Sequence, residues 1–286
     1  MGLRINTNVD ALDAYRNLSM TQSKLSDSLQ KLSSGYRINK AADDAAGLSI
    51  SQKLQAQIGG LQQAVKNAQD GINVVQTADG ALNEVSAILQ RMNVLAVQAA
   101  NGGSQDADAQ AAAQAEIVQL NQTLDSIANT TKFGQNALLS GSYTGVFQVG
   151  ADNNAADQIT VDLSSTSSLW TTAGITGVTS TGLGTDTVDV STTAGAQSAI
   201  ATIATAIKGV STVRATLGAY QNQFQHVINN LNVTVENLQA SNSAIRDTDM
   251  AQEMVNFTQA QVLQQAGVSM LAQANTETQA VLKLLQ

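Results

Sequence analysis

The residue types that carry most enzymatic chemistry are scarce in this chain of 286 residues. It contains no cysteine, which excludes a thiol nucleophile, a disulfide framework and a thiolate metal site. Its single histidine, His226, lies at helical spacing beside Val227, so we interpret it as the flank of a helix seam rather than a general base. One histidine also excludes the His-x-x-x-His zinc motif. We therefore expect a protein that is not an enzyme, with no catalytic, metal-binding or cofactor-binding residue and no cofactor.

Two other clusters have residue types that could bind ligands. Asp43 and Asp44 could form a ligand pair, but acidic residues are also favoured in the first turn of a helix, where they interact with the helix dipole. Gly182-Leu183-Gly184 lacks the third glycine and the preceding strand of a dinucleotide-binding loop. We predict that the aspartates mark a helix start and that the glycines bind nothing.

Composition narrows the classes of partner and the class of fold. The formal net charge of -8 disfavours nucleic acid, since binding to phosphates requires basic residues. No stretch approaches the roughly 18 apolar residues of a membrane span, and the first residues lack the apolar run of a cleaved secretory signal. Taken alone, this predicts a cytosolic protein or one exported without a cleaved signal.

The chain has no proline, where average usage would give roughly 14, and aromatic residues make up 3%. Both features favour long helices joined by aliphatic seams.

The N-terminal half shows regular apolar spacing. Leu18, Leu25 and Leu32 lie seven residues apart and predict a helix over 8–33, followed by a polar connector at 34–44. A heptad seam then runs from Leu54 to Ala99, which predicts one long coiled-coil helix. After a glycine-containing stop at 101–103, a second helix over 106–129 should return antiparallel to it.

The middle of the chain differs in character. Residues 133–207 contain no lysine or arginine, and 143–149 and 158–163 alternate with period two, which predicts strands in a hairpin. Residues 164–195 are rich in Ser, Thr and Gly, which predicts a loop or a small, sparsely packed excursion. This window is either a glycosylated surface or a solvated loop, and both interpretations stay open.

Helical spacing resumes at Ile200 and continues to Leu238, where polar Ser241-Asn242-Ser243 predicts a break. We predict a last helix from about 247, with an apolar face that comprises Met250, Met254, Phe257, Leu271 and Leu282. We interpret these residues as an ordinary packing face and not as a cofactor site. The predicted fold is mainly α: a long antiparallel helical coiled-coil rod formed by the N- and C-terminal segments, with a small β-hairpin region and an irregular insert in the middle.

Several specific motifs lie towards the two ends of the chain: Arg4-Ile5-Asn6-Thr7-Asn8, Leu32-Ser33-Ser34-Gly35-Tyr36-Arg37-Ile38-Asn39-Lys40-Ala41-Ala42-Asp43-Asp44-Ala45-Ala46-Gly47-Leu48-Ser49-Ile50-Ser51, Asn67-Ala68-Gln69-Asp70-Gly71-Ile72, Thr77-Ala78-Asp79-Gly80-Ala81-Leu82, Leu217-Gly218-Ala219-Tyr220-Gln221-Asn222-Gln223 and Ala244-Ile245-Arg246-Asp247-Thr248-Asp249-Met250-Ala251. These motifs resemble those of bacterial flagellin. They cover about 1–140 and 200–286 and form a highly specific set.

The resemblance implies a domain plan and a structural role. Residues 1–44 and 243–286 would pair in an inner filament-core domain, with 45–140 and 200–242 as the helices of a rod domain and 141–199 as a hairpin and variable insert. The subunit would be secreted through the flagellar type III export apparatus with a chaperone. It would polymerise with itself into the extracellular flagellar filament for swimming motility, next to hook-associated and cap proteins. The implied polymerisation residues are Leu18, Leu25, Leu32, Met254, Phe257, Leu271 and Leu282.

A second implied surface lies on the rod. Residues 90–98 resemble the patch through which an animal Toll-like receptor recognises many flagellins, although Val94 and Leu120 stand where a glutamate and an arginine are common. The residues that this surface would contribute are Gln90, Arg91, Leu95, Gln98 and Glu116. Subunit stacking would use the same surface, so receptor binding and stacking both stay open.

Three alternatives remain. A hook–filament junction protein shares the terminal pattern but does not polymerise by itself. A flagellin with a protease insert would need a zinc-binding histidine pair, which this chain lacks. A secreted coiled-coil toxin that inserts in membranes would need a markedly apolar helix, whereas every predicted helix here carries regular Gln, Asn or Ser.

Overall fold

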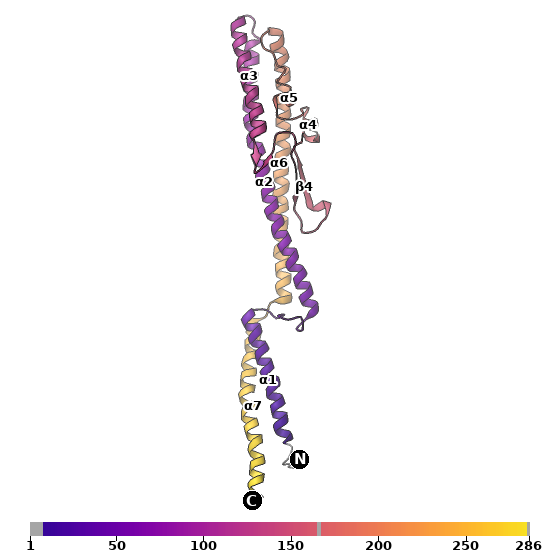
Figure 1. Ribbon diagram of the computed structural model, residues 1–286, viewed down its shortest axis with the longest axis vertical. Coiled ribbons are helices and arrows are strands. Elements are labelled where there is room, and N and C mark those ends of the chain that lie inside the picture. The colour runs from indigo at the N-terminus through magenta and orange to yellow at the C-terminus, as the bar shows by residue number, and fades with distance from the viewer. Residues whose placement is uncertain (1–7, 165–166, 285–286) are drawn as a thin grey trace. The chain divides into compact units, whose positions relative to one another are not determined.

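The computed structural model describes residues 8–164 and 167–284, without the side chains of Ser168 and of 277–284. The expected N-terminal motif residues Arg4 to Thr7 and the side chain of Leu282 lie outside the described residues. The chain divides into two compact units, Met1–Ala56 with Glu236–Gln286, and Gln57–Val235. Long helices dominate both units (Figure 1), which confirms the mainly α prediction.

In the first unit, helix α1 (Val9–Ser34) packs against helix α7 (Met250–Leu284). Asn8 starts α1, since its side chain accepts a hydrogen bond from the backbone N–H of Ala11 at 3.0 Å, and Gly35 ends it in the left-handed conformation with φ 73°. The side chain of Asn8 also donates to the carbonyl of Ala274 at 2.9 Å. The start of α1 therefore lies beside the later part of α7, and the two helices run antiparallel.

At the other end of this helix pair, the residues after α1 contact the residues before α7. Tyr36 and Asp247 form an antiparallel bridge, and the backbone N–H of Arg37 donates to the carbonyl of Arg246 at 2.7 Å. The guanidinium of Arg246 lies 4.2 Å from the centre of the Tyr36 ring, which is cation–π geometry. The predicted polar connector at 34–44 is thus ordered, with Tyr36 and Arg37 in contact with Arg246 and Asp247 shortly before α7.

The second unit is built on helix α3 (Ala107–Thr130) and on most of helices α2 (Ala45–Ala99) and α6 (Thr193–Arg246), whose outer ends, up to Ala56 and from Glu236, belong to the first unit. The seam predicted on α2 is its core-facing side, where the fully or almost fully buried positions are Ala68, Ile72, Val75, Ala78, Leu82, Val85, Leu89, Met92, Ala96 and Ala99. Between α2 and α6, Gly71 leaves room for the ring of Phe224, because an added Cβ would approach the ring to 2.6 Å. Arg214 of α6 pairs with Asp79 of α2, with Nε and Oδ1 2.8 Å apart.

Two small hairpins follow α3. Strands β1 (Lys132–Phe133) and β2 (Asn136–Ala137) pair antiparallel, as do β3 (Thr144–Gln148) and β4 (Gln158–Asp162). The second pair, in which Thr144 lies opposite Asp162 and Gln148 opposite Gln158, confirms the hairpin predicted from the period-two alternation. A single turn of 3-10 helix, η1 (Ala155–Asp157), leads into β4.

At 164–195 the expectation of a loop or a small, sparsely packed excursion holds for most of the described backbone, but the expected sparse packing was wrong. This segment contains helices α4 (Ser168–Ala173) and α5 (Ser180–Leu183). Its apolar residues are buried in the core of the unit: Trp170, Ile175, Val178, Leu183, Val188 and Val190. Six apolar side chains spaced among small polar residues have no periodic signal, yet together they bury enough surface to anchor the segment.

The predicted break at Ser241-Asn242-Ser243 was also wrong, since α6 continues to Arg246. The three residues lie at exposed or half-buried positions, and the hydroxyl of Ser241 donates to the carbonyl of Asn237, one turn earlier, at 2.8 Å. Small polar residues that bond back to the preceding turn are tolerated within a helix. Helices α2 and α6 also begin earlier than predicted, at Ala45 and Thr193 rather than near 54 and 200.

Candidate assembly and recognition surfaces

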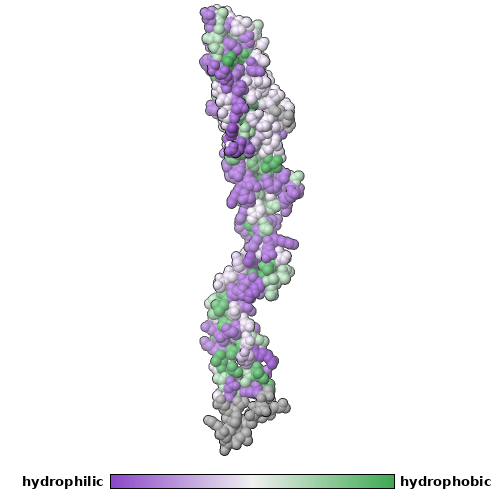
Figure 2. Space-filling view, in the orientation of Figure 1, coloured by the Kyte–Doolittle hydropathy of each residue, from purple (hydrophilic) through white to green (hydrophobic). Residues whose placement is uncertain are grey.

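The α1–α7 pair leaves most of its large apolar side chains in solvent. Tyr15 is 63% exposed and Val262 is 64% exposed. Their exposed neighbours on the two helices are Val9, Leu12, Met20, Leu29, Met250, Met254, Val255, Leu263, Val268 and Met270. Figure 2 shows green, hydrophobic patches among purple ones over the α1–α7 pair. Single exposed apolar residues are normal, but a concentration of this kind marks an interaction surface.

Little apolar surface is buried inside the pair itself. Among the described side chains of α1 and α7, the buried ones are Ser28, Glu253 and Ala260. Glu253, which is 8% exposed, accepts a hydrogen bond from the side-chain amide of Asn256 at 3.2 Å. Two antiparallel helices with such a small, polar centre gain little from their mutual contact.

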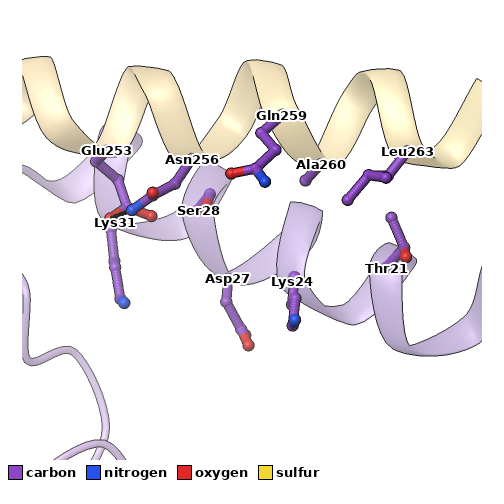
Figure 3. Close-up of a pocket in the computed structure, with 10 residues that line it drawn as sticks. All are labelled: Thr21, Lys24, Asp27, Ser28, Lys31, Glu253, Asn256, Gln259, Ala260 and Leu263. Carbon is purple, nitrogen blue, oxygen red and sulfur yellow. Dashed lines mark hydrogen bonds between the residues drawn. The ribbon is translucent and has the colours of Figure 1, made fainter. Parts of the chain in front are cut away.

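A groove of about 350 Å³ runs between the two helices (Figure 3). Gln259 and Leu263 reach toward α1 from α7, whereas the charged ends of Lys24, Asp27 and Lys31 point away from α7. The charged groups of α1 thus lie at the edge of the groove. Apart from Glu253, the other lining residues are uncharged. The groove does not have the convergent polar groups of a catalytic site.

The terminal residues predicted for polymerisation divide into two groups. Leu18, Leu25, Leu32, Phe257 and Leu271 are half-buried, because they face the partner helix of the pair. Met254 is exposed, so it is free to contact another molecule. The predicted seven-residue spacing therefore identified mainly the intrachain contact, while the exposed apolar residues lie on the remaining faces.

On the second unit, α2 and α3 carry the surface predicted around residues 90–98. Arg91 and Glu116 form a two-point ion pair, Nε to Oε1 at 2.7 Å and Nη2 to Oε2 at 3.0 Å. The hydrogen bond from Arg91 lowers the pKa of Glu116, and the hydrogen bond to Glu116 raises the pKa of Arg91. Gln90 and Gln98 are exposed nearby, as are Val94 at 55% and Val97.

Leu95 is not part of that exposed surface. Its side chain is 3% exposed and belongs to the core cluster that also contains Ile117 of α3. Another molecule cannot directly contact a side chain that is buried in the core. The expectation that Leu95 contributes to the partner-binding surface was therefore wrong. Leu120, the second departure from the common pattern, is half-buried on α3.

The remaining candidates for chemistry have structural explanations. His226 is exposed on α6 between buried Phe224 and Ile228, as expected for the flank of a seam. Asp44 precedes α2, and its carboxylate accepts from the backbone N–H of Gly47 at 2.8 Å. Asp43 accepts from the backbone N–H groups of Asn39 and Lys40, and these bonds lower its pKa. The aspartates thus order the connector and the helix start.

Within residues 8–164 and 167–284, no group of three or more His, Cys, Asp or Glu side chains is placed to hold a metal ion. The same described ranges contain no helix that combines the length and the apolar character needed to cross a bilayer.

A set of contacts on a different face of α3 from Glu116 was not predicted from the sequence. Gln114, Asn121 and Asp125 bond to the backbone of the segment that follows α4. Each contact joins one polar side chain to a main-chain atom, which leaves no apolar periodicity to detect. The one available signal was that these polar residues recur at helical spacing.

Comparison with known proteins settles the family. Residues 5–144 match the model of the bacterial flagellin N-terminal helical region, and residues 200–285 match that of the C-terminal helical region. A flagellin from Halalkalibacterium halodurans is 46% identical over 283 residues, which cover 99% of each chain. The chain belongs to the bacterial flagellin family.

Other flagellins are similar along their whole length. A flagellin from Bacillus subtilis is 43% identical, over 99% of this chain and all of the relative. A crystal structure of Bacillus cereus flagellin is 31% identical, and the match covers 58% of this chain and 88% of that chain with a TM-score of 0.46. Flagellins are structural subunits of the flagellar filament, which lies outside the cell, and not enzymes, so family membership confirms the prediction of a non-enzymatic protein.

Proposed function

We propose that this flagellin polymerises chiefly through the exposed apolar faces of the α1–α7 pair, with 1–44 and 243–286 forming the inner domain of the filament. The observation that carries this is the burial pattern: large apolar side chains such as Tyr15 and Val262 face solvent, while the centre of the pair holds Ser28, Glu253 and Ala260. Many identical copies can cover such faces by head-to-tail contacts that do not close, which produces a helical filament.

The rest of the proposed domain plan follows the same division. Residues 45–140 and 200–242 would stack as the rod domain, and 141–199 would form the hairpin and insert. We also propose export through the flagellar type III apparatus with a chaperone, and contact with hook-associated and cap proteins at the ends of the filament. Support for these partners comes from family membership alone.

The polymerisation proposal is tested by Val262→Asp, with Gln261→Asp as its control. Both positions are exposed on α7, and both variants add one charge, so the difference between them reports the loss of apolar surface. Purified chains would be dissociated by heat, cooled and seeded with filament fragments, and filament mass would be measured by sedimentation and negative-stain microscopy. We expect Val262→Asp to abolish filaments and Gln261→Asp to retain them.

Filaments at wild-type yield from Val262→Asp would refute the proposed contact. A wild-type chain that stays monomeric under seeding would instead favour the hook–filament junction alternative. A chain that lacks 1–44 supplies an independent test, because the pairing model requires that it cannot polymerise while its second unit remains helical by circular dichroism.

For the α2–α3 surface we propose two uses, subunit stacking and recognition by an animal Toll-like receptor. Support comes from the exposure of Gln90, Arg91, Gln98 and Glu116 beside exposed Val94. Arg91→Ala should reduce receptor signalling in a reporter cell line, whereas Arg214→Ala, which removes a comparable ion pair on α2 and α6, should not. If both variants signal as strongly as the wild type, the receptor proposal is wrong and subunit stacking remains the one proposed use of this surface.

A further inference from the structure

One face of α3 is lined with polar side chains that bond mainly to one neighbouring segment. The face begins at Gln110 and continues four, eleven and fifteen residues later at Gln114, Asn121 and Asp125. At 3.6 residues per turn, these spacings place the four side chains within about 60° of one another around the helix axis. We call these four residues the α3 column. The segment opposite them, residues 180–193, we call the strap.

The centre of the column contacts the strap through main-chain atoms. Gln114 makes a two-point contact, since its amide donates to the carbonyl of Val188 at 3.2 Å and its Oε1 accepts from the N–H of Val190 at 2.7 Å. Asn121 donates to the carbonyl of Thr185 at 2.8 Å. Gln114 therefore satisfies the strap backbone as a neighbouring β-strand would.

The ends of the strap are held by contacts that also involve its side chains. Asp125 accepts from the backbone N–H of Ser180 at 2.8 Å and from its hydroxyl at 2.9 Å, at the first turn of α5. At the other end the Gln110 amide lies 3.5 Å from the Thr193 hydroxyl, and it also donates to the carbonyl of Ala99, the last residue of α2, at 3.0 Å. The contacts with the strap thus extend from Ser180 to Thr193.

The strap's side chains separate into two sets. Leu183, Val188 and Val190 are buried against the core. The polar positions are exposed, among them Thr181, Asp186 and Asp189. Since the column bonds to the backbone, it fixes the path of the strap without contacting these exposed side chains.

We propose that the α3 column is a dock for the main chain of the strap, which holds the strap against the core and turns its exposed polar side chains into a fixed display surface. Residues 145–199 lie outside both regions matched by the family models, whereas α3 lies inside the first of them. A dock that bonds to backbone atoms permits different side chains on the display surface while the underlying rod helices keep one structure.

The test compares amide hydrogen exchange in the full-length chain and two variants. Gln114→Ala with Asn121→Ala removes the centre of the column, and Gln119→Ala with Gln122→Ala removes two exposed polar side chains from another face of α3. Both variants replace amides with alanine, so both raise helix propensity alike. Exchange is followed by mass spectrometry in peptides that cover 180–192 and, as a reference, 210–225 of α6.

We expect the column variant to exchange at least about tenfold faster in the strap than the control, as the loss of buried hydrogen bonds predicts, with α6 unchanged in both. Equal strap exchange in the two variants would overturn the dock, and so would a parallel rise in strap and α6, which would indicate general destabilisation. A third variant, Thr181→Ala with Asp186→Ala, should leave strap exchange as in the wild type. Faster exchange there would show that the exposed side chains hold the strap, contrary to the proposal.

Discussion

Arg91 of α2 and Glu116 of α3 are 25 residues apart in the chain and meet in a two-point ion pair on the surface of the second unit. Their geometry is that of a guanidinium opposite a carboxylate, with two parallel hydrogen bonds of 2.7 and 3.0 Å. Any partner that binds this surface therefore encounters a neutral pair rather than two separate charges.

The pH dependence of this pair is the first prediction. The hydrogen bond from Arg91 lowers the pKa of Glu116 in the folded chain. The stabilisation is therefore complete above the unfolded-state value, about 4.3 for glutamate, and is lost as the pH falls through the lowered folded-state pKa. A double-mutant cycle of Arg91→Ala and Glu116→Ala should give a small favourable coupling at pH 7 that disappears below that range.

High salt should also reduce this coupling, because both side chains are exposed. A coupling that is unchanged at acidic pH would mean that the interaction does not depend on the ionised carboxylate.

The burial of Leu95 predicts a stability effect rather than a direct binding effect. Leu95→Ala should lower the free energy of unfolding of the second unit by about 2–5 kcal/mol, the usual range for removing a buried leucine side chain. Val94→Ala, at an exposed neighbour, should change it by less than about 0.5 kcal/mol. Urea unfolding followed by circular dichroism distinguishes the two, and a Leu95→Ala chain of wild-type stability would contradict the buried position.

The fit between Gly71 and Phe224 predicts opposite effects at two glycines of α2. Gly71→Ala places a methyl group against the Phe224 ring and should destabilise the chain by about 1–3 kcal/mol. At Gly80 nothing lies within 4 Å of an added Cβ, so Gly80→Ala should stabilise the helix by about 0.5–1 kcal/mol.

Thermal melts of both alanine variants would measure these effects. Adding Phe224→Leu to Gly71→Ala should restore part of the loss, because the smaller side chain leaves room for the methyl group. No rescue would indicate that the contact with the ring is not the source of the strain.

Trp170 is the single tryptophan of the chain and is fully buried in the core of the second unit. We expect blue-shifted emission that iodide quenches poorly, and a red shift on denaturation that coincides with the loss of helical circular dichroism. Emission like that of free tryptophan in native buffer would show that the insert is not packed on the helices.

The elements that could be predicted from sequence are those that repeat. The heptad seam of α2 is buried as expected at Leu82 and Leu89, because a seven-residue apolar spacing has few other ways to be buried. The β3–β4 hairpin was predictable for the same reason, with period two in place of period 3.5.

The elements that could not be predicted depend on single contacts between distant residues. Leu95 was misassigned because the buried face of α2 widens where α3 packs against it, so that both Leu95 and Ala96 are buried. Trp170 and Val190 were missed because isolated apolar residues in a Ser/Thr-rich segment have no period. The polar contacts of Gln114 and of Arg246 join side chains to distant backbone or rings, and no local pattern marks them.

The small polar centre of the α1–α7 pair has a consequence for the subunit outside the filament. In the proposed assembly, a helix pair that buries Ser28, Glu253 and Ala260 would gain most of its stability from copies that cover it, so by mass action that stability would rise with subunit concentration. Proteases cut chains that open locally, and opening is most frequent where stability is lowest. We therefore expect the two ends of an unincorporated subunit to be its preferred cleavage sites and incorporation to protect them, which would remove stray subunits while sparing the finished polymer.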